Sequence, residues 1–175
     1  MKDRITKLLQ STERKGIDKL IEYMENAGFF EAPCSTQFHL SREGGLAEHS
    51  LNVYQFGMDF YRNPVPIMNH PTATEEWTVV SLLHDIGKAS YRGHDQYIPN
   101  ILKSGQQSKD KPYATNPDRL YIPHEIVSLF IVKQFIELTE EEEFAILYHN
   151  GMYVPSGRDI NGKERPLQLL LHFAD

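Results

Sequence analysis

Four histidines and two aspartates lie at expected helix ends or beside apolar neighbours, where side chains of these types could bind a metal ion. They are His49, His84, Asp85, His124, His149 and Asp175. Imidazole and carboxylate together suit borderline divalent metals such as iron, manganese, nickel or zinc, whereas calcium sites are built from oxygen alone. A single histidine in an apolar helix is more often a hydrogen-bonded core residue. The indication of a metal site therefore depends on the six residues taken together.

Two short motifs place the first of these residues near helix ends. His84 and Asp85 lie in Leu82-Leu83-His84-Asp85-Ile86-Gly87-Lys88, at the carboxyl end of an apolar run, and His49 lies in Gly44-Gly45-Leu46-Ala47-Glu48-His49-Ser50. Adjacent helical residues point about 100° apart. The His84-Asp85 pair can therefore address one ion only at a helix surface where several helices converge.

Both motifs resemble those of the HD-domain superfamily. The stretch from Leu82 to Lys88 resembles its signature, and the stretch from Gly44 to Ser50 resembles the Gly-Gly-Leu-x-x-His segment that precedes its first ligand. The order of the six residues is similar to that of the binuclear subtype, known among cyclic-dinucleotide phosphodiesterases and related nucleotide phosphohydrolases. The resemblance runs from about residue 30 to the last residue.

The resemblance implies two divalent transition metal ions (Fe, Mn, Ni or Zn) that share Asp85. One ion would be bound by His49, His84, Asp85 and Asp175, and the second by Asp85, His124 and His149. Two such ions can share a hydroxide and clamp a phosphoryl group. The implied function is hydrolysis of a phosphoester of a nucleotide or cyclic dinucleotide, with Asp85 and Lys88 as catalytic residues. Lys88 would pair with a substrate phosphate, and its alternative role is that of a cation at a helix carboxyl end.

Two other functions are compatible with the same residues. Mixed-valence di-iron oxygenases of the inositol-oxygenase type have the same ligand order, and a catalytically silent nucleotide-binding module could retain the fold without turnover.

A phosphorylated substrate is favoured by the stretch from Lys88 to Pro123, which has six cations and three aspartates in an acidic chain, together with several tyrosines that could stack on a base. We therefore interpret residues 89–123 as an irregular cover over the substrate. The alternative is a solvated loop whose tyrosines pack on the core. The candidate substrate-binding residues are Lys88, Arg42, Arg92, Tyr91 and Tyr153.

Apolar spacing and turn signals predict the elements that hold these residues. Helices are expected near residues 16–27, with a shorter one before, and over 46–61, where Asn63, Pro64 and Pro66 would end the helix. Further helices are expected from a Thr72–Glu75 capping box to about Gly87, over 126–135, from a Thr139–Glu142 capping box to His149, and over 167–175. Asn161-Gly162 suggests a type I′ β-hairpin near residues 157–165. We predict an all-α, HD-domain helical bundle of about six or seven helices, in one domain over residues 1–175 with an N-terminal helical segment at 1–28.

Composition narrows the expected environment and partners. The net charge of −6 argues against a polybasic membrane binder and against a stable nucleic-acid complex, so the expected partner is a small phosphorylated substrate. Cys34 is the only cysteine, which excludes an intramolecular disulfide and suits a reducing compartment. We interpret the Cys34 thiol as an unreactive group that packs against its neighbours. With no signal-peptide core near the start of the chain, we predict a cytoplasmic protein; the sequence says nothing about oligomeric state.

Overall fold

Helices dominate the computed structural model, which describes residues 1–62 and 74–175. The α-helices of this part are α1 (Lys2–Gln10), α2 (Ile17–Asn26), α3 (Gly45–Arg62), α4 (Thr74–Leu83), α5 (His124–Val132), α6 (Glu140–Tyr148) and α7 (Pro166–Ala174). Short 3-10 helices follow α4 and α6, namely η1 (Ile86–Lys88), η2 (Gly151–Tyr153) and η3 (Pro155–Ile160). The predicted all-α fold is confirmed. The proposed helix stop at 63–66 and the capping residue Thr72 lie outside the described residues.

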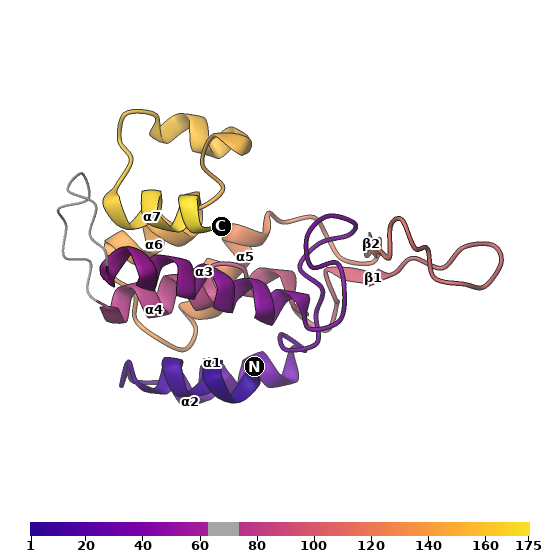
Figure 1. Ribbon diagram of the computed structural model, residues 1–175, viewed down its shortest axis with the longest axis horizontal. Coiled ribbons are helices and arrows are strands. Elements are labelled where there is room, and N and C mark those ends of the chain that lie inside the picture. Colours follow the sequence, from indigo (N-terminus) through magenta and orange to yellow (C-terminus); the bar gives the residue numbers. More distant parts are fainter. Residues whose placement is uncertain (63–73) are drawn as a thin grey trace.

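Helix α4 is the centre of the bundle. All of its residues from Trp77 to Leu83 are buried, as expected for a helix surrounded by others rather than one with a single apolar stripe. It contacts α3, α1, α6 and α7, and Figure 1 shows α1 and α2 on one side of the α3–α4 pair with α6 and α7 on the other. The carboxyl end of α4 therefore emerges among several other helix ends. None of the helices in the described ranges is long and apolar enough to span a bilayer.

The predicted capping box at the start of α6 is confirmed, and it also anchors the N-terminal helices. Thr139 Oγ1 accepts a hydrogen bond from the backbone N–H of Glu142, and the Glu142 carboxylate accepts one from the backbone N–H of Thr139. The same buried carboxylate accepts two hydrogen bonds from Arg14, at 2.6 and 2.8 Å. Arg14 thus ties the α1–α2 segment to the helix that directly precedes His149.

The β-hairpin predicted near residues 157–165 is wrong in its position. Residues Pro155–Ile160 form η3, and Asn161 has φ −55° and ψ 122° before Gly162 with φ 76°. These angles describe a type II turn, which is closed by the hydrogen bond from Lys163 N–H to the Ile160 carbonyl. The twist of a type II turn does not match that of two paired strands, whereas the twist of a type I′ turn does. The small antiparallel sheet is formed instead by β1 (Tyr97–Pro99) and β2 (Tyr113–Thr115).

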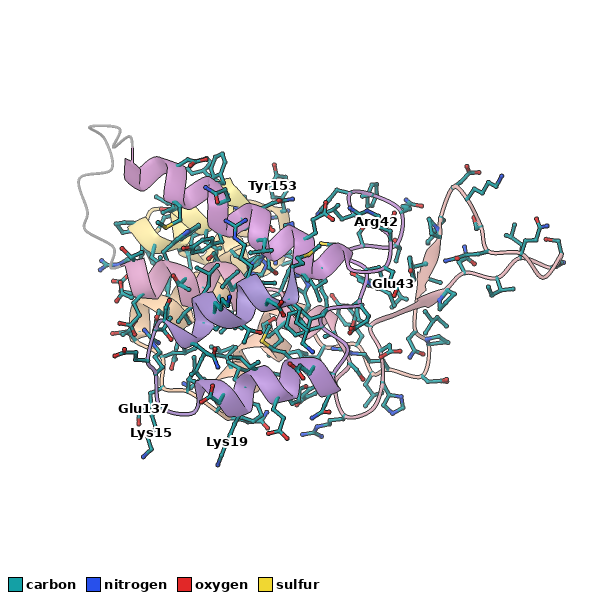
Figure 2. All side chains as sticks on the ribbon, turned by 60° about the horizontal axis from the view of Figure 1, so that its bottom comes forward. Lys15, Lys19, Arg42, Glu43, Glu137 and Tyr153 are labelled. Atoms are coloured by element: carbon teal, nitrogen blue, oxygen red, sulfur yellow. The ribbon has the colours of Figure 1, made fainter. Side chains whose placement is uncertain are left out.

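The sheet is the base of an arm within residues 89–123. Figures 1 and 2 both show the chain between β1 and β2 projecting away from the helices. The arm is ordered by its own hydrogen bonds, among them Asn100 N–H to the Pro112 carbonyl at 2.8 Å and Ser108 N–H to the Asn100 carbonyl at 2.9 Å. The two ends of the segment return to the helical body, where Tyr91 packs against the core.

Candidate metal centre

The six predicted ligands lie where helix ends converge. His49 is in the first turns of α3, His84 and Asp85 directly follow α4, and His124 is the first residue of α5. The remaining two, His149 and Asp175, directly follow α6 and α7. Each helix thus contributes a side chain near its terminus, and packing of the helices around α4 brings these termini together.

The six side chains form two groups that share Asp85. In one group, ligand atoms of His49, His84, Asp85 and Asp175 all lie within 4.8 Å of one another, and so do those of Asp85, His124 and His149 in the other. Asp85 Oδ2 lies 3.5 Å from His49 Nε2 and 3.6 Å from His84 Nε2. Its second oxygen, Oδ1, lies 3.1 Å from His124 Nε2 and 3.6 Å from His149 Nε2. The two oxygens of one carboxylate therefore face different groups, as a bridging ligand would.

Backbone carbonyls orient the imidazole rings. The Nδ1 atom of His84 lies 3.0 Å from the Ser81 carbonyl oxygen, and that of His149 lies 2.7 Å from the Ile146 carbonyl oxygen. A carbonyl can only accept, so Nδ1 carries the proton in each ring and the Nε2 lone pair faces the cluster. The buried Glu125 carboxylate lies 3.4 Å from His124 Nδ1, within ion-pair distance of that ring.

The donor set fits a pair of divalent cations. Nε2 atoms approach one another at 3.3 Å in the His49–His84 pair and in the His124–His149 pair, and Asp175 Oδ1 lies 2.8 Å from His49 Nε2, so several donor atoms converge in each group. Asp85 is fully buried, and its Oδ1 has no hydrogen-bond partner among the described residues. Such an orphaned oxygen is costly unless an ion uses it. Burial alone would raise the pKa of Asp85, but Lys88 and the histidines outweigh that effect and hold it well below its usual range.

The structure places Lys88, the predicted catalytic cation, beside the six candidate ligands. Its Nζ donates to Asp85 Oδ2 at 2.5 Å, and its side chain is 14% exposed. Burial alone would lower the pKa of Lys88, yet the Asp85 carboxylate raises it above the ordinary value, so the side chain remains charged. Lys88 also ends η1, so its position suits both roles that the sequence allows, a partner for a phosphate and a cation at a helix carboxyl end.

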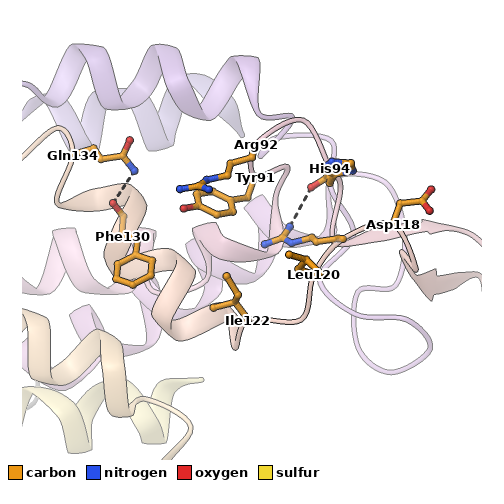
Figure 3. Close-up of a pocket in the computed structure, with 9 residues that line it drawn as sticks. Tyr91, Arg92, His94, Asp118, Leu120, Ile122, Phe130 and Gln134 are labelled. Carbon is orange, nitrogen blue, oxygen red and sulfur yellow. Dashed lines mark hydrogen bonds between the residues drawn. The ribbon is translucent and has the colours of Figure 1, made fainter.

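The other predicted substrate-binding residues lie on three different segments of the chain. Arg42 is half exposed and pairs with Glu48, and Tyr153 on η2 is 89% exposed (Figure 2). Tyr91 and Arg92 line a cavity of about 520 Å³ together with Phe130 (Figure 3). None of the six ligands lines that cavity. Their proposed contact with the substrate stays a prediction.

Two residues near the cluster were not predicted as ligands. Cys34 Sγ lies 3.5 Å from His39 Nε2, and these two atoms form a third group of possible metal donors with His49. Burial raises the pKa of Cys34 to about 12, so the thiol stays protonated at neutral pH. Because the loop that carries both residues has no helical periodicity, spacing gave no signal for this contact.

Comparison with known proteins gives one match. The family model of the HD domain matches residues 46–174, which is well over half of the chain and includes five of the six predicted ligands. No curated protein and no solved structure matches the chain.

Proposed function

The chain belongs to the HD domain family, whose members are generally metal-dependent hydrolases, and from that premise we propose that it hydrolyses a phosphoester of a nucleotide or cyclic dinucleotide. In this proposal two divalent transition metal ions bind at the two groups of side chains that share Asp85. The expected substrate is small, and the expected location is the cytoplasm. We also propose that residues 1–175 form a single domain.

One observation carries the proposal: the two oxygens of the buried Asp85 carboxylate face two separate sets of imidazole nitrogens. When bound, a pair of ions at such a site supplies a nucleophile from water at neutral pH and offsets charge on a phosphoryl group. The carbonyls of Ser81 and Ile146 hold two imidazole rings so that Nε2 is free to bind a metal. These contacts fix the orientation of the two rings in the absence of substrate.

Lys88 supplies a fixed positive charge beside this site. Its Nζ is held at Asp85 Oδ2 by a charge-assisted hydrogen bond. A phosphate group that approaches Asp85 therefore meets an ammonium already in place, which favours binding and offsets charge that develops on phosphoryl oxygens. This cation favours hydrolysis of a phosphoester over the oxygenase reaction, for which the same ligand order would serve.

The test is a screen for phosphate or nucleotide release with mononucleotides, linear dinucleotides and cyclic dinucleotides in added Mn²⁺. We expect turnover by the wild type and its loss in Asp85→Asn, which keeps the side-chain volume and removes the charge. The matched control is Asp3→Asn, an exposed aspartate on α1, which should retain activity. Absence of release from every substrate class by the metal-loaded wild type would contradict the proposal.

Two further measurements on the purified protein would indicate the alternatives. Tightly bound iron with a visible absorption band that changes on reduction, together with dioxygen consumption, would indicate the di-iron oxygenase. Saturable nucleotide binding without release of phosphate would indicate the catalytically silent module.

A further inference from the structure

The turn that carries Lys88 has little internal support. It is the three-residue helix η1, whose hydrogen bonds run from Lys88 N–H to the Asp85 carbonyl at 2.9 Å and from Ala89 N–H to the Ile86 carbonyl at 3.0 Å. A 3-10 turn of this length has poor hydrogen-bond geometry, and the carbonyls at its end have no partner within the turn. The position of Lys88 therefore depends on what contacts η1 from outside.

Helix α5 contacts one side of η1. Ser128 Oγ accepts a hydrogen bond from Gly87 N–H at 2.8 Å, and a Cβ on Gly87 would lie 2.2 Å from the His124 carbonyl oxygen. Gly87 thus allows the turn to pack directly against the first turn of α5. This contact fixes the amide side of the turn and leaves its carbonyls to other partners.

Arg119 binds the carbonyls on the other side. Its Nη2 donates to the Gly87 carbonyl and its Nη1 to the Ala89 carbonyl, both at 2.7 Å. These two carbonyls belong to the residues on either side of Lys88. The rigid fork of one guanidinium therefore holds the backbone before and after the lysine, and places a cation at the carboxyl end of the turn.

Arg119 is itself held by a turn at the end of the loop. Its backbone N–H donates to the carbonyl of the buried Asn116. The Asn116 side chain donates to the Asp95 carbonyl and accepts from Asp118 N–H, both at 3.0 Å. The Arg119 guanidinium also lies over the Tyr91 ring and donates a longer hydrogen bond to the His94 carbonyl. Tyr91 and His94 both line the cavity shown in Figure 3. No carboxylate pairs with Arg119 in the part of the chain that the structure describes, so its strong hydrogen bonds go to backbone.

We propose that Arg119 is a positioning residue, which fixes the η1 turn and thereby sets where the Lys88 ammonium lies relative to Asp85 and the substrate phosphate. The catalytic part of this inference depends on the proposed function, whereas the structural part does not. It also gives the irregular stretch 89–123 a role besides that of a cover, because the last part of that stretch supports the active-site turn.

The first test is a double-mutant cycle with Arg119→Lys, which keeps the charge but cannot bind both carbonyls as a fork. We expect kcat to fall by about 10- to 100-fold with KM less affected, since a displacement of about 1 Å at a catalytic group has effects of this size. In a Lys88→Ala background the same change should cause no further loss. Metal content should be unchanged, because Arg119 contacts none of the six ligands. Arg4→Lys is the matched control, an exposed arginine on α1 that bonds Gln55.

Additive losses of kcat in the double variant would overturn the inference, because a general loss of stability acts independently of Lys88. An unchanged kcat in Arg119→Lys would overturn it as well. Arg119→Gln serves as a second variant if Arg119→Lys does not fold.

The second test measures hydrogen exchange and needs no activity. We expect the amides of Lys88 and Ala89 to exchange at least about tenfold faster in Arg119→Lys than in the wild type or Arg4→Lys, as local opening of the turn becomes easier. Faster exchange in a protein that hydrolyses none of the phosphoesters would support the structural role of Arg119 and reject the proposed function. Unchanged exchange would overturn the positioning role whatever the activity.

Discussion

Gly87 packs against the first turns of α5, which carry His124, and Gly87→Ala should remove the second metal ion while the first stays bound. An added Cβ would lie 2.2 Å from the carbonyl oxygen of His124 and 2.9 Å from the backbone nitrogen of Ser128. Both are backbone atoms of the first turns of α5, so no side-chain rotation can relieve the contact. The η1 turn and helix α5 therefore have to move apart, which separates His124 from Asp85 at the start of the turn.

The size of the movement follows from these distances. Ordinary contact begins at 3.4 Å, so the gap between Gly87 and His124 must widen by about 1.2 Å. Metal–ligand distances tolerate about 0.2 Å, so His124 can no longer bind an ion held by Asp85 and His149. Overpacking of this kind typically costs about 1–3 kcal/mol of stability, and a 1 Å misplacement in an active site costs about 100-fold in rate.

The assay combines elemental analysis, hydrolysis and urea denaturation, with Gly57→Ala as the control. A Cβ at Gly57 would lie 2.1 Å from the Trp77 indole, so this variant is also overpacked in the core. Gly57 is eight residues beyond His49 on α3, about 12 Å along the helix, and the atoms nearest to an added Cβ there belong to Trp77. We expect both variants to lose stability and only Gly87→Ala to lose one ion per chain. Two bound ions and wild-type turnover in Gly87→Ala would refute the reasoning.

Three further predictions test other parts of the structure. Arg14→Ala should lower the free energy of unfolding by about 3 kcal/mol, because it leaves the buried Glu142 carboxylate without its cation; urea denaturation measures this, and a loss below about 1 kcal/mol would contradict it. Thr139→Ala should cost about 1 kcal/mol through loss of the α6 cap and Thr139→Ser much less, measured in the same way. Acidification from pH 7.5 to 5.5 should release metal, because protons compete for the imidazole nitrogens; equilibrium dialysis followed by elemental analysis would show it, and a constant metal content would count against histidine ligation.

The sequence predicted most of the helices because their signals are local. Apolar spacing and the Thr139–Glu142 capping box each concern residues within a few positions of one another, and the structure contains both features. The convergence of the six candidate ligands was predicted by family resemblance. Spacing along the chain could not supply it, since the six come from five different helix ends.

The remaining features depend on contacts between distant segments. The hairpin was placed at Asn161-Gly162 because that dipeptide is common in type I′ turns, but the chain before it forms η3, and the actual strands are only three residues long. Arg119 appeared in the sequence as one cation among several in a basic loop. Its bonds to the Gly87 and Ala89 carbonyls are visible only in the structure.

The most direct test of the central claim, that Asp85 joins two metal sites, is the metal content per chain after equilibration with Mn²⁺. We predict two ions in the wild type and in His94→Gln, which changes an exposed histidine outside the cluster, and one ion in His149→Gln, which removes a ligand of the second site alone. A wild-type protein with one ion or none, or a His149→Gln variant that still binds two, would contradict the binuclear centre.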